Sequence, residues 1–61
     1  MKLVYCVTRN EWFDNAPDNT DGVEDFDDLV EAIKRCDILN KQTPQHVNVE
    51  YYVRVFYYWR K

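Results

Sequence analysis

The residues that most often carry chemistry are few in this chain and far apart. Cys6 and Cys36 are the only cysteines, His46 is the only histidine, and serine is absent. Nucleophilic catalysis needs a nucleophile, a nearby base and a group that orients the base. A pair of one thiol with His46 is conceivable, but a lone histidine beside Pro44 in a connecting segment is typical of an ordinary surface residue. The sequence therefore predicts a protein that is not an enzyme.

Residues 18–28, DNTDGVEDFDD, have the composition of a calcium-binding loop but not its spacing. With Gly22 in the sixth position of an EF-hand loop, Pro17 takes the first position and Asp28 the twelfth. The first ligand is then missing, and the last is shorter than the glutamate that the pattern requires. Two cysteines and one histidine match no zinc spacing, and a single glycine cannot build a phosphate-binding loop. We expect no metal and no cofactor.

The length of 61 residues predicts a single domain, residues 1–61, with a small core. A chain of this size buries only about 60% of its unfolded surface, so it usually needs a disulfide, a metal or a partner. Both cysteines fall inside predicted regular elements, where we expect buried free thiols. Residues 1–8 are too short and too mixed for a signal peptide, and no stretch has the length of a membrane span. We expect a cytoplasmic protein without membrane contact.

The net charge of −3 conceals a strong segregation of charge along the chain. Nine acids and no Lys or Arg lie between Glu11 and Glu31. One interpretation is a solvated loop and helix face, which keep the protein dispersed in water. The other is an acidic surface that meets a basic groove on a partner. The candidate partner-binding acids of this segment are Asp14, Asp18, Asp21, Asp27, Asp28 and Glu31.

The first half of the chain predicts a strand, a loop and a helix. Residues 2–9 are apolar in both alternations, which is typical of a central strand. Residues 14–22 are rich in Pro, Gly, Asn and Asp and predict a loop. A helix is predicted from Asp25, as the N-cap, to about Asp37. Its apolar residues recur at the spacing of one helical face, and we expect them in the core: Phe26, Leu29, Val30 and Ile33, with Cys36 at the margin.

Residues 47–59 carry an apolar side chain at every odd position, which predicts a long strand with its odd face in the core. At about 3.3 Å per residue this strand would reach roughly 43 Å, beyond the diameter of about 27 Å of a compact chain this short. We therefore expect it to overhang the domain and to expose an unpaired backbone edge. The even positions form its second face: Tyr52, Arg54, Phe56, Tyr58 and Arg60.

That second face is the other candidate surface. Tyr and Arg are enriched at binding hot spots, so Tyr52, Arg54, Phe56 and Tyr58 are predicted to bind a partner. The alternative is that the segment holding Trp12 and Phe13 folds over these rings as a hydrophobic lid. Together the elements predict a small α/β (α+β) two-layer sandwich, one helix on a two- to three-stranded sheet with a long C-terminal strand. We expect its first and last strands to be parallel, with a right-handed crossover.

In its size, its acid-rich and Tyr-rich composition and its strand–helix–strand plan, the chain resembles small phage-encoded inhibitors of host enzymes or defence complexes. The resemblance is one of class and assigns no residue a role. It implies an inhibitor or regulator in the host cytoplasm that occupies the surface of a partner protein, or that imitates the charge of DNA with residues 11–31. One alternative is a single-stranded nucleic-acid-binding module on the aromatic and arginine face, which a pI near 4.9 disfavours. The other is an oligomerising structural subunit, whose partner is a second copy of the chain.

Overall fold

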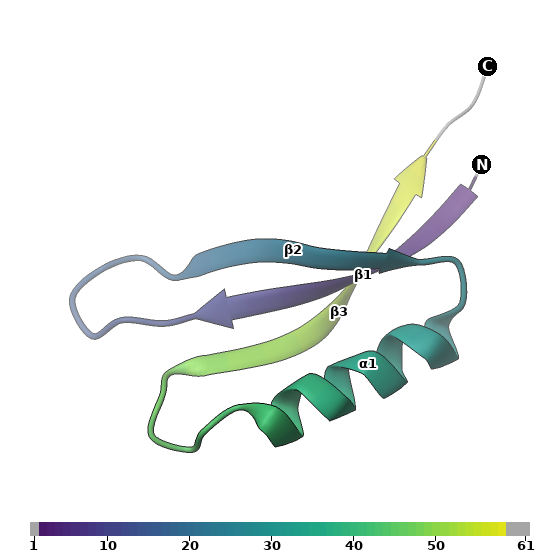
Figure 1. The fold of residues 1–61 in the computed structure, drawn as a ribbon. Helices are drawn as coiled ribbons and strands as arrows, with labels where there is room; N and C mark the ends of the chain where they lie inside the picture. Colours follow the sequence, from purple (N-terminus) through teal and green to yellow (C-terminus); the bar gives the residue numbers. More distant parts are fainter. Residues whose placement is uncertain (1, 59–61) are drawn as a thin grey trace.

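A computed structural model describes residues 2–58, and it places one helix against a three-stranded antiparallel sheet (Figure 1). The elements follow the order β1 (Lys2–Glu11), β2 (Asn19–Phe26), α1 (Leu29–Gln42) and β3 (Val49–Tyr58). The predicted α+β architecture, with one helix on a small sheet and a long last strand, is confirmed. Trp59 and Arg60, which the alternation assigned to that strand, lie outside the described residues.

Strand β1 occupies the centre of the sheet, in the strand order β2-β1-β3. Its middle residues are buried on both faces, as the sequence of this segment indicates: Val4, Cys6, Val7 and Thr8. Val7 forms the core together with Ala32 and Cys36 of the helix. Five half-buried side chains surround this cluster: Tyr5, Phe26, Leu39, Tyr51 and Val53. Tyr51 and Val53 confirm that the odd residues of the last strand face the helix.

The prediction that the first and last strands are parallel is wrong. Strand β3 pairs antiparallel with β1 along its whole length, from Lys2 opposite Tyr58 to Glu11 opposite Val49. The reason is strand β2, which the sequence patterns did not predict. Strand β2 reverses the direction of the chain before the helix begins. The helix therefore runs in the same general direction as β1, and β3 returns in the opposite direction, antiparallel to β1.

Strand β2 begins within the segment predicted to be a loop. Its sequence, NTDGVEDF, holds residues that are rare in strands, and all of them except the half-buried Phe26 are exposed. Pairing with the central strand stabilises it, with a register irregularity between Val7 and Thr8 that accommodates the additional residue. The connecting loop is therefore confined to residues 12–18. The calcium-like motif lies in this extended strand, where successive carboxylates alternate between the two faces.

The helix begins and ends later than predicted. Asp28, not Asp25, is the N-cap, because its carboxylate accepts a hydrogen bond from the Val30 amide at 3.0 Å. Asp25 belongs to β2. The helix continues past Asp37 to Gln42. Its fourteen residues do not have the length and apolar character that crossing a bilayer requires.

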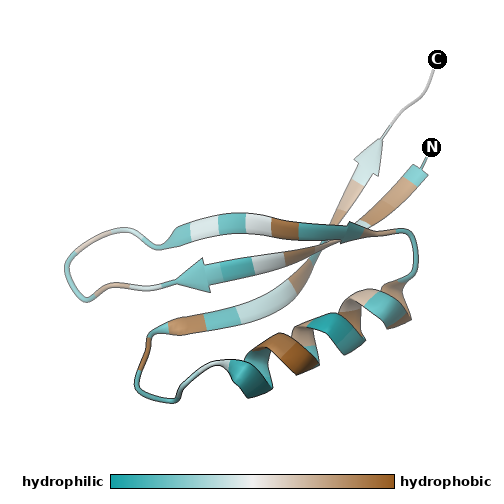
Figure 2. Ribbon diagram, viewed as in Figure 1, coloured by the Kyte–Doolittle hydropathy of each residue, from teal (hydrophilic) through white to brown (hydrophobic). Residues whose placement is uncertain are grey.

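The helix also packs with a different face from the one predicted. Ala32 and Cys36 are buried against Val7, whereas Leu29, Val30 and Ile33 are 42%, 55% and 52% exposed. The small side chains of Ala32 and Cys36 let the helix lie close to the sheet, and this rotation turns the larger residues outward. Apolar residues, brown in Figure 2, consequently lie on the surface of the helix as well as inside the molecule.

The molecule is long and thin, with Cα extents of 44 × 25 × 10 Å. The first residues of β1 and the last residues of β3 extend together past the end of β2 and away from the helix (Figure 1). The overhang expected for the last strand is therefore a two-stranded ribbon, in which β1 pairs with one edge of β3 and the other edge stays open.

Candidate functional site

The face of the sheet opposite the helix collects the four strand residues predicted to bind a partner. Residues directly opposed in an antiparallel pair lie on the same face. Arg54 stands opposite Cys6, and Phe56 stands opposite Val4. The odd residues of β1 and β3 pack toward the helix, so these even residues face away from it. We call Tyr52, Arg54, Phe56 and Tyr58 the aromatic–arginine ridge.

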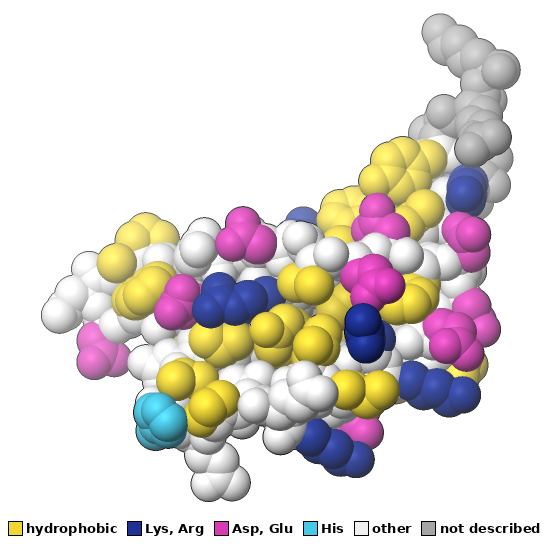
Figure 3. All heavy atoms as spheres, viewed as in Figure 1, with side chains coloured by type: hydrophobic (Ala, Val, Ile, Leu, Met, Phe, Trp, Pro, Cys, Tyr) yellow, Lys and Arg dark blue, Asp and Glu magenta, His cyan; other side chains and the backbone are white. Residues whose placement is uncertain are grey.

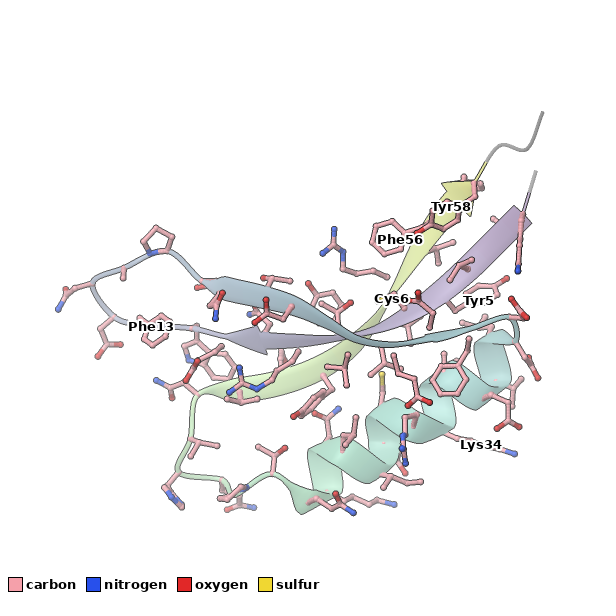
Figure 4. The ribbon with its side chains drawn as sticks, turned by 45° about the horizontal axis from the view of Figure 1, so that its top comes forward. Tyr5, Cys6, Phe13, Lys34, Phe56 and Tyr58 are labelled. Atoms are coloured by element: carbon pink, nitrogen blue, oxygen red, sulfur yellow. The ribbon has the colours of Figure 1, made fainter. Side chains whose placement is uncertain are left out.

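The ridge is exposed at Tyr52, Arg54 and Tyr58, whereas Phe56 is half-buried. Tyr52 is 38% and Tyr58 50% exposed. The Arg54 guanidinium lies over the Phe56 ring, 5.0 Å from its centroid, a cation–π contact that holds both side chains along the strand. Figure 4 shows the Phe56 and Tyr58 side chains on the side of the sheet away from the helix.

No lid of described residues covers the ridge. The Trp12 amide donates a hydrogen bond to the Asn48 carbonyl at 3.0 Å, which continues the pairing of β1 with the segment before β3. Trp12 and Phe13 are 38% and 46% exposed, and Phe13 lies in the loop at the end of the β1–β2 hairpin (Figure 4). The alternative in which this segment completes a second core is therefore wrong.

Beside the ridge, the central strand forms a floor of small buried side chains. Val4, Cys6 and Thr8 are only 9%, 6% and 0% exposed. Gly22 of β2 adjoins this floor, and a Cβ atom there would lie 3.2 Å from the Cys6 sulfur. The absence of a side chain at Gly22 therefore permits the close approach that buries Cys6.

An acidic rim borders the floor on the side of β2. Asp25 stands opposite Cys6 and so shares its face. Asp27, just past the end of β2, forms an ion pair with Lys2 at 3.4 Å. The helix-free face thus presents an apolar and cationic ridge on β3 and carboxylates near β2, with small side chains between them.

The predicted acidic surface is not one patch. Asp14 and Asp18 lie in the hairpin loop and Asp21 near the start of β2, whereas the other three lie at the far end of β2 and the start of the helix. In Figure 3 acidic side chains, magenta, are interspersed with basic and apolar ones. Several acids also have partners within the chain: Asp28 caps the helix, Asp27 pairs with Lys2, and Glu31 pairs with Lys34 at 3.9 Å.

Neither thiol is placed for nucleophilic chemistry. Cys6 lies on the helix-free face and Cys36 in the core on the helix side, so the sheet separates the two free cysteines. Burial raises the pKa of both thiols, and at Cys6 it outweighs the opposing hydrogen bond from Thr8. A raised pKa keeps a thiol protonated at neutral pH, and the protonated form is a poor nucleophile. His46 is exposed in the segment between α1 and β3.

An open groove of about 390 Å³ lies on the helix side, near the C-terminal end of α1. Arg9 and Glu11 lie in its wall and form an ion pair with each other at 3.6 Å. Their charges are therefore already matched, and the remaining lining is mixed apolar and polar: Leu39, Gln42, Thr43, Pro44, Val47, Val49 and Tyr51. This groove offers no convergent set of catalytic groups.

Four further exposed apolar residues were missed by the sequence reasoning, because all four were assigned to the core. They are Leu29 and Ile33 on the helix and Val55 and Tyr57 on β3, which are between 42% and 62% exposed. We call these four residues the edge patch. Alternation placed Val55 and Tyr57 on the inner face, and the short helix leaves them uncovered.

Comparisons of the chain with protein-family models, with curated proteins and with solved structures found no match.

Proposed function

We propose that this chain is a non-enzymatic protein-binding module, an inhibitor or regulator that occupies a partner's surface with its helix-free face. The observation that carries the proposal is the exposed aromatic–arginine ridge on a face that no described element covers. Tyr and Arg dominate binding hot spots because they combine large contact area with hydrogen bonding. Burial of each ring against a partner contributes about 1.5–3 kcal/mol.

The chemistry of the face indicates what kind of partner surface fits. Apolar groups of the partner would pack on the exposed rings of the ridge, since the floor residues beside it are already buried. Lys or Arg side chains of the partner would meet the carboxylates of Asp25 and Asp27 at the acidic rim. Complementary charge of this kind selects the partner and its orientation more than it adds affinity.

Nucleic acid fits the same face less well. Binding to phosphates requires several cations, since each neutralised phosphate releases condensed counterions. Among the even residues of β1 and β3 only Lys2 and Arg54 are cationic, and Lys2 already pairs with Asp27. The Asp25 carboxylate on this face repels phosphate. A protein partner is therefore favoured over single-stranded nucleic acid, and the divided acidic surface gives weaker support to DNA mimicry.

The test compares capture of a partner by three forms of the immobilised protein in bacterial lysate. The face variant is Tyr52→Ser, Phe56→Ser, Tyr58→Ser. The control variant is Trp12→Ser, Phe13→Ser, which removes aromatic rings of similar exposure that lie outside the ridge. We expect the parent and the control to retain the same protein and the face variant to lose it, with circular dichroism showing all three folded.

Two outcomes would contradict the proposal. The first is a folded face variant that keeps the captured protein. The second is tight binding of single-stranded DNA or RNA by the parent, measured by mobility shift at low salt and weakening steeply as salt is added.

A further inference from the structure

The two outer edges of the sheet differ in how they are protected against pairing with another strand. Exposed edges are usually blocked by charged residues, proline or irregular pairing. The β2 edge has such features, with Asp21, Gly22 and Glu24 in sequence and a register irregularity against β1. Strand β3 has no proline, glycine or lysine, its only acid is Glu50 near its start, and Arg54 is its one cation. The β3 edge thus lacks these protections beyond Glu50 except for the single charge of Arg54.

Asn40 of the helix shows which backbone groups point out of this edge. Its side-chain amide donates to the Tyr51 carbonyl at 3.0 Å and accepts from the Tyr51 amide at 2.8 Å, as a neighbouring strand would. Outward and inward groups alternate along a strand. Val53, Val55 and Tyr57 therefore also direct their N–H and C=O groups away from β1. Among the described residues these groups have no hydrogen-bond partner.

Val55 and Tyr57 of the edge patch lie on the strand that carries these open backbone groups, and Leu29 and Ile33 lie on the helix. Leu29, Ile33 and Asn40 are separated by four and seven residues, so they lie on one side of the helix. Asn40, near the C-terminal end of the helix, reaches the edge of β3 at Tyr51, whereas Leu29 begins the helix shortly after the end of β2. Ile33 and Leu29 are 52% and 42% exposed.

We propose that β3 pairs antiparallel with β3 of a second copy of the chain, with Val55 of each copy facing the other across a two-fold axis. In this register Val53 of one copy stands opposite Tyr57 of the other. All three open pairs of N–H and C=O groups then find partners, and one sheet continues across both copies.

The positions of the open groups select this register. An axis nearer the start of β3 would draw Tyr51 into the pairing, and its groups are already bonded to Asn40. An axis nearer Tyr58 would leave Val53 facing positions beyond the end of the strand. With the axis at Val55, Arg54 of one copy stands across from Phe56 of the other. The two residues already make a cation–π contact within one chain.

The distribution of charge also fits a second copy as the occupant. A net charge of −3 on each copy opposes self-association in general. The acids of residues 11–31, however, lie mostly on β2 and its flanks, and β1 separates β2 from the β3 edge. From Tyr51 to Tyr58 the strand carries Arg54 as its only charge. The acidic surfaces of two copies therefore stay on the outer sides of the joined sheet.

The test uses charges at the axis and does not depend on the proposed function, since Val55 faces away from the ridge. Sedimentation equilibrium over a concentration series is run on the parent and on Val55→Lys, Val55→Glu and an equimolar mixture of the two. Val23→Lys is the control, because Val23 is similarly exposed but lies on β2. We expect dimers for the parent and the control, monomers for each Val55 variant alone, and restored dimers in the mixture.

Amide hydrogen exchange provides a second measurement. Protection of the Val53, Val55 and Tyr57 amides should rise with protein concentration in the parent and stay low in Val55→Lys. A parent that remains monomeric at high micromolar concentration overturns the proposal. This holds even if a strand of another protein is found to pair with the β3 edge. A mixture that stays monomeric while the parent dimerises overturns the register. Val55→Lys should still capture the partner of the helix-free face. The proposed dimer and the proposed partner binding can therefore fail independently of each other.

Discussion

At the residue scale, Gly22 and Cys6 depend on each other. A Cβ atom at position 22 would stand 3.2 Å from the Cys6 sulfur, closer than ordinary van der Waals contact. Alanine in place of glycine otherwise favours a strand by roughly 0.5–1 kcal/mol, because it reduces the freedom of the unfolded chain. Gly22→Ala therefore combines a gain in propensity with strain against a buried side chain.

We predict that Gly22→Ala is more favourable in a Cys6→Ala background than in the parent, by about 0.5–1 kcal/mol. Cys6→Ala removes the sulfur that the new methyl group meets, so only the propensity effect remains. Urea denaturation of the parent, both single variants and the double variant gives the coupling energy. Additive effects would show that the strand shifts to admit the methyl group without strain.

Because the two thiols are buried, the free energy of unfolding should depend on pH in the alkaline range. Burial raises the pKa of Cys6 and Cys36 in the folded protein, so folding favours their protonated forms. Below the ordinary thiol pKa of about 8.5 both states are protonated and this contribution is fully present. Above that pH the unfolded state loses protons first, and the free energy of unfolding falls as the pH rises toward the folded-state values.

We expect the parent to lose more stability between pH 7 and the alkaline range than a Cys6→Ala, Cys36→Ala double variant. Tyr and Lys groups are common to both proteins, so the difference between their curves isolates the thiols. Denaturant titrations at several pH values measure it. Parallel curves for the two proteins would mean that the thiols titrate alike in the folded and unfolded states.

At the scale of elements, the helix uses small residues to pack and leaves larger ones outside. Val7 is fully buried between Ala32 and Cys36, whereas Ile33 is 52% exposed. In dilute monomer we predict that Ile33→Ala costs less than about 1 kcal/mol, because much of its side chain is already in water. Val7→Ala should cost about 2 kcal/mol, through lost burial and the cavity that remains. Thermal or urea melts at low concentration compare the two; a larger loss for Ile33→Ala would restore the predicted helix face.

An element could be predicted from the sequence where its pattern depends only on its own residues. The long β3 strand was predictable because period-two alternation is a property of its own residues. The existence of the helix was predictable for the same reason, but its facing depends on which side chains fit against Val7. Leu29 and Ile33 matched the helical periodicity, yet Ala32 and Cys36 allow closer packing. Packing against the sheet therefore determined which side of the helix is buried.

Strand β2 and the arrangement of the site depend on pairing over distance. The residues Asn19 to Gly22 favour turns locally, and they form a strand because β1 offers hydrogen bonds to them. The common face of Tyr52, Arg54, Phe56 and Tyr58 was predictable from alternation alone. The acidic rim beside the floor was not predictable, since the position of Asp25 depends on the missed strand. The edge patch was hidden by the assignment of its helical residues to the core.

At the scale of the whole molecule, the fold is thin for the number of apolar residues it carries. Its Cα extent in the shortest direction is 10 Å, and five apolar residues are buried within the described range 2–58. Large apolar side chains are exposed on both faces, including Phe13, Val30, Tyr57 and Tyr58. A chain this small has a narrow stability margin, and any species that binds only the folded state adds to it. Stability and association should therefore be linked.

We predict that the melting temperature of the parent rises with protein concentration, because pairing at the β3 edge requires folded chains and follows mass action. Val23→Lys should show the same rise, since the β2 edge takes no part in the pairing. Val55→Lys should melt at one temperature over the whole series, and at or below the parent's value in dilute solution. Calorimetry or circular dichroism over a hundredfold concentration range measures the three curves. If the parent's melting temperature does not change with concentration, the exposed apolar surfaces of this fold are not covered by a second copy, and their burial must come from a different partner.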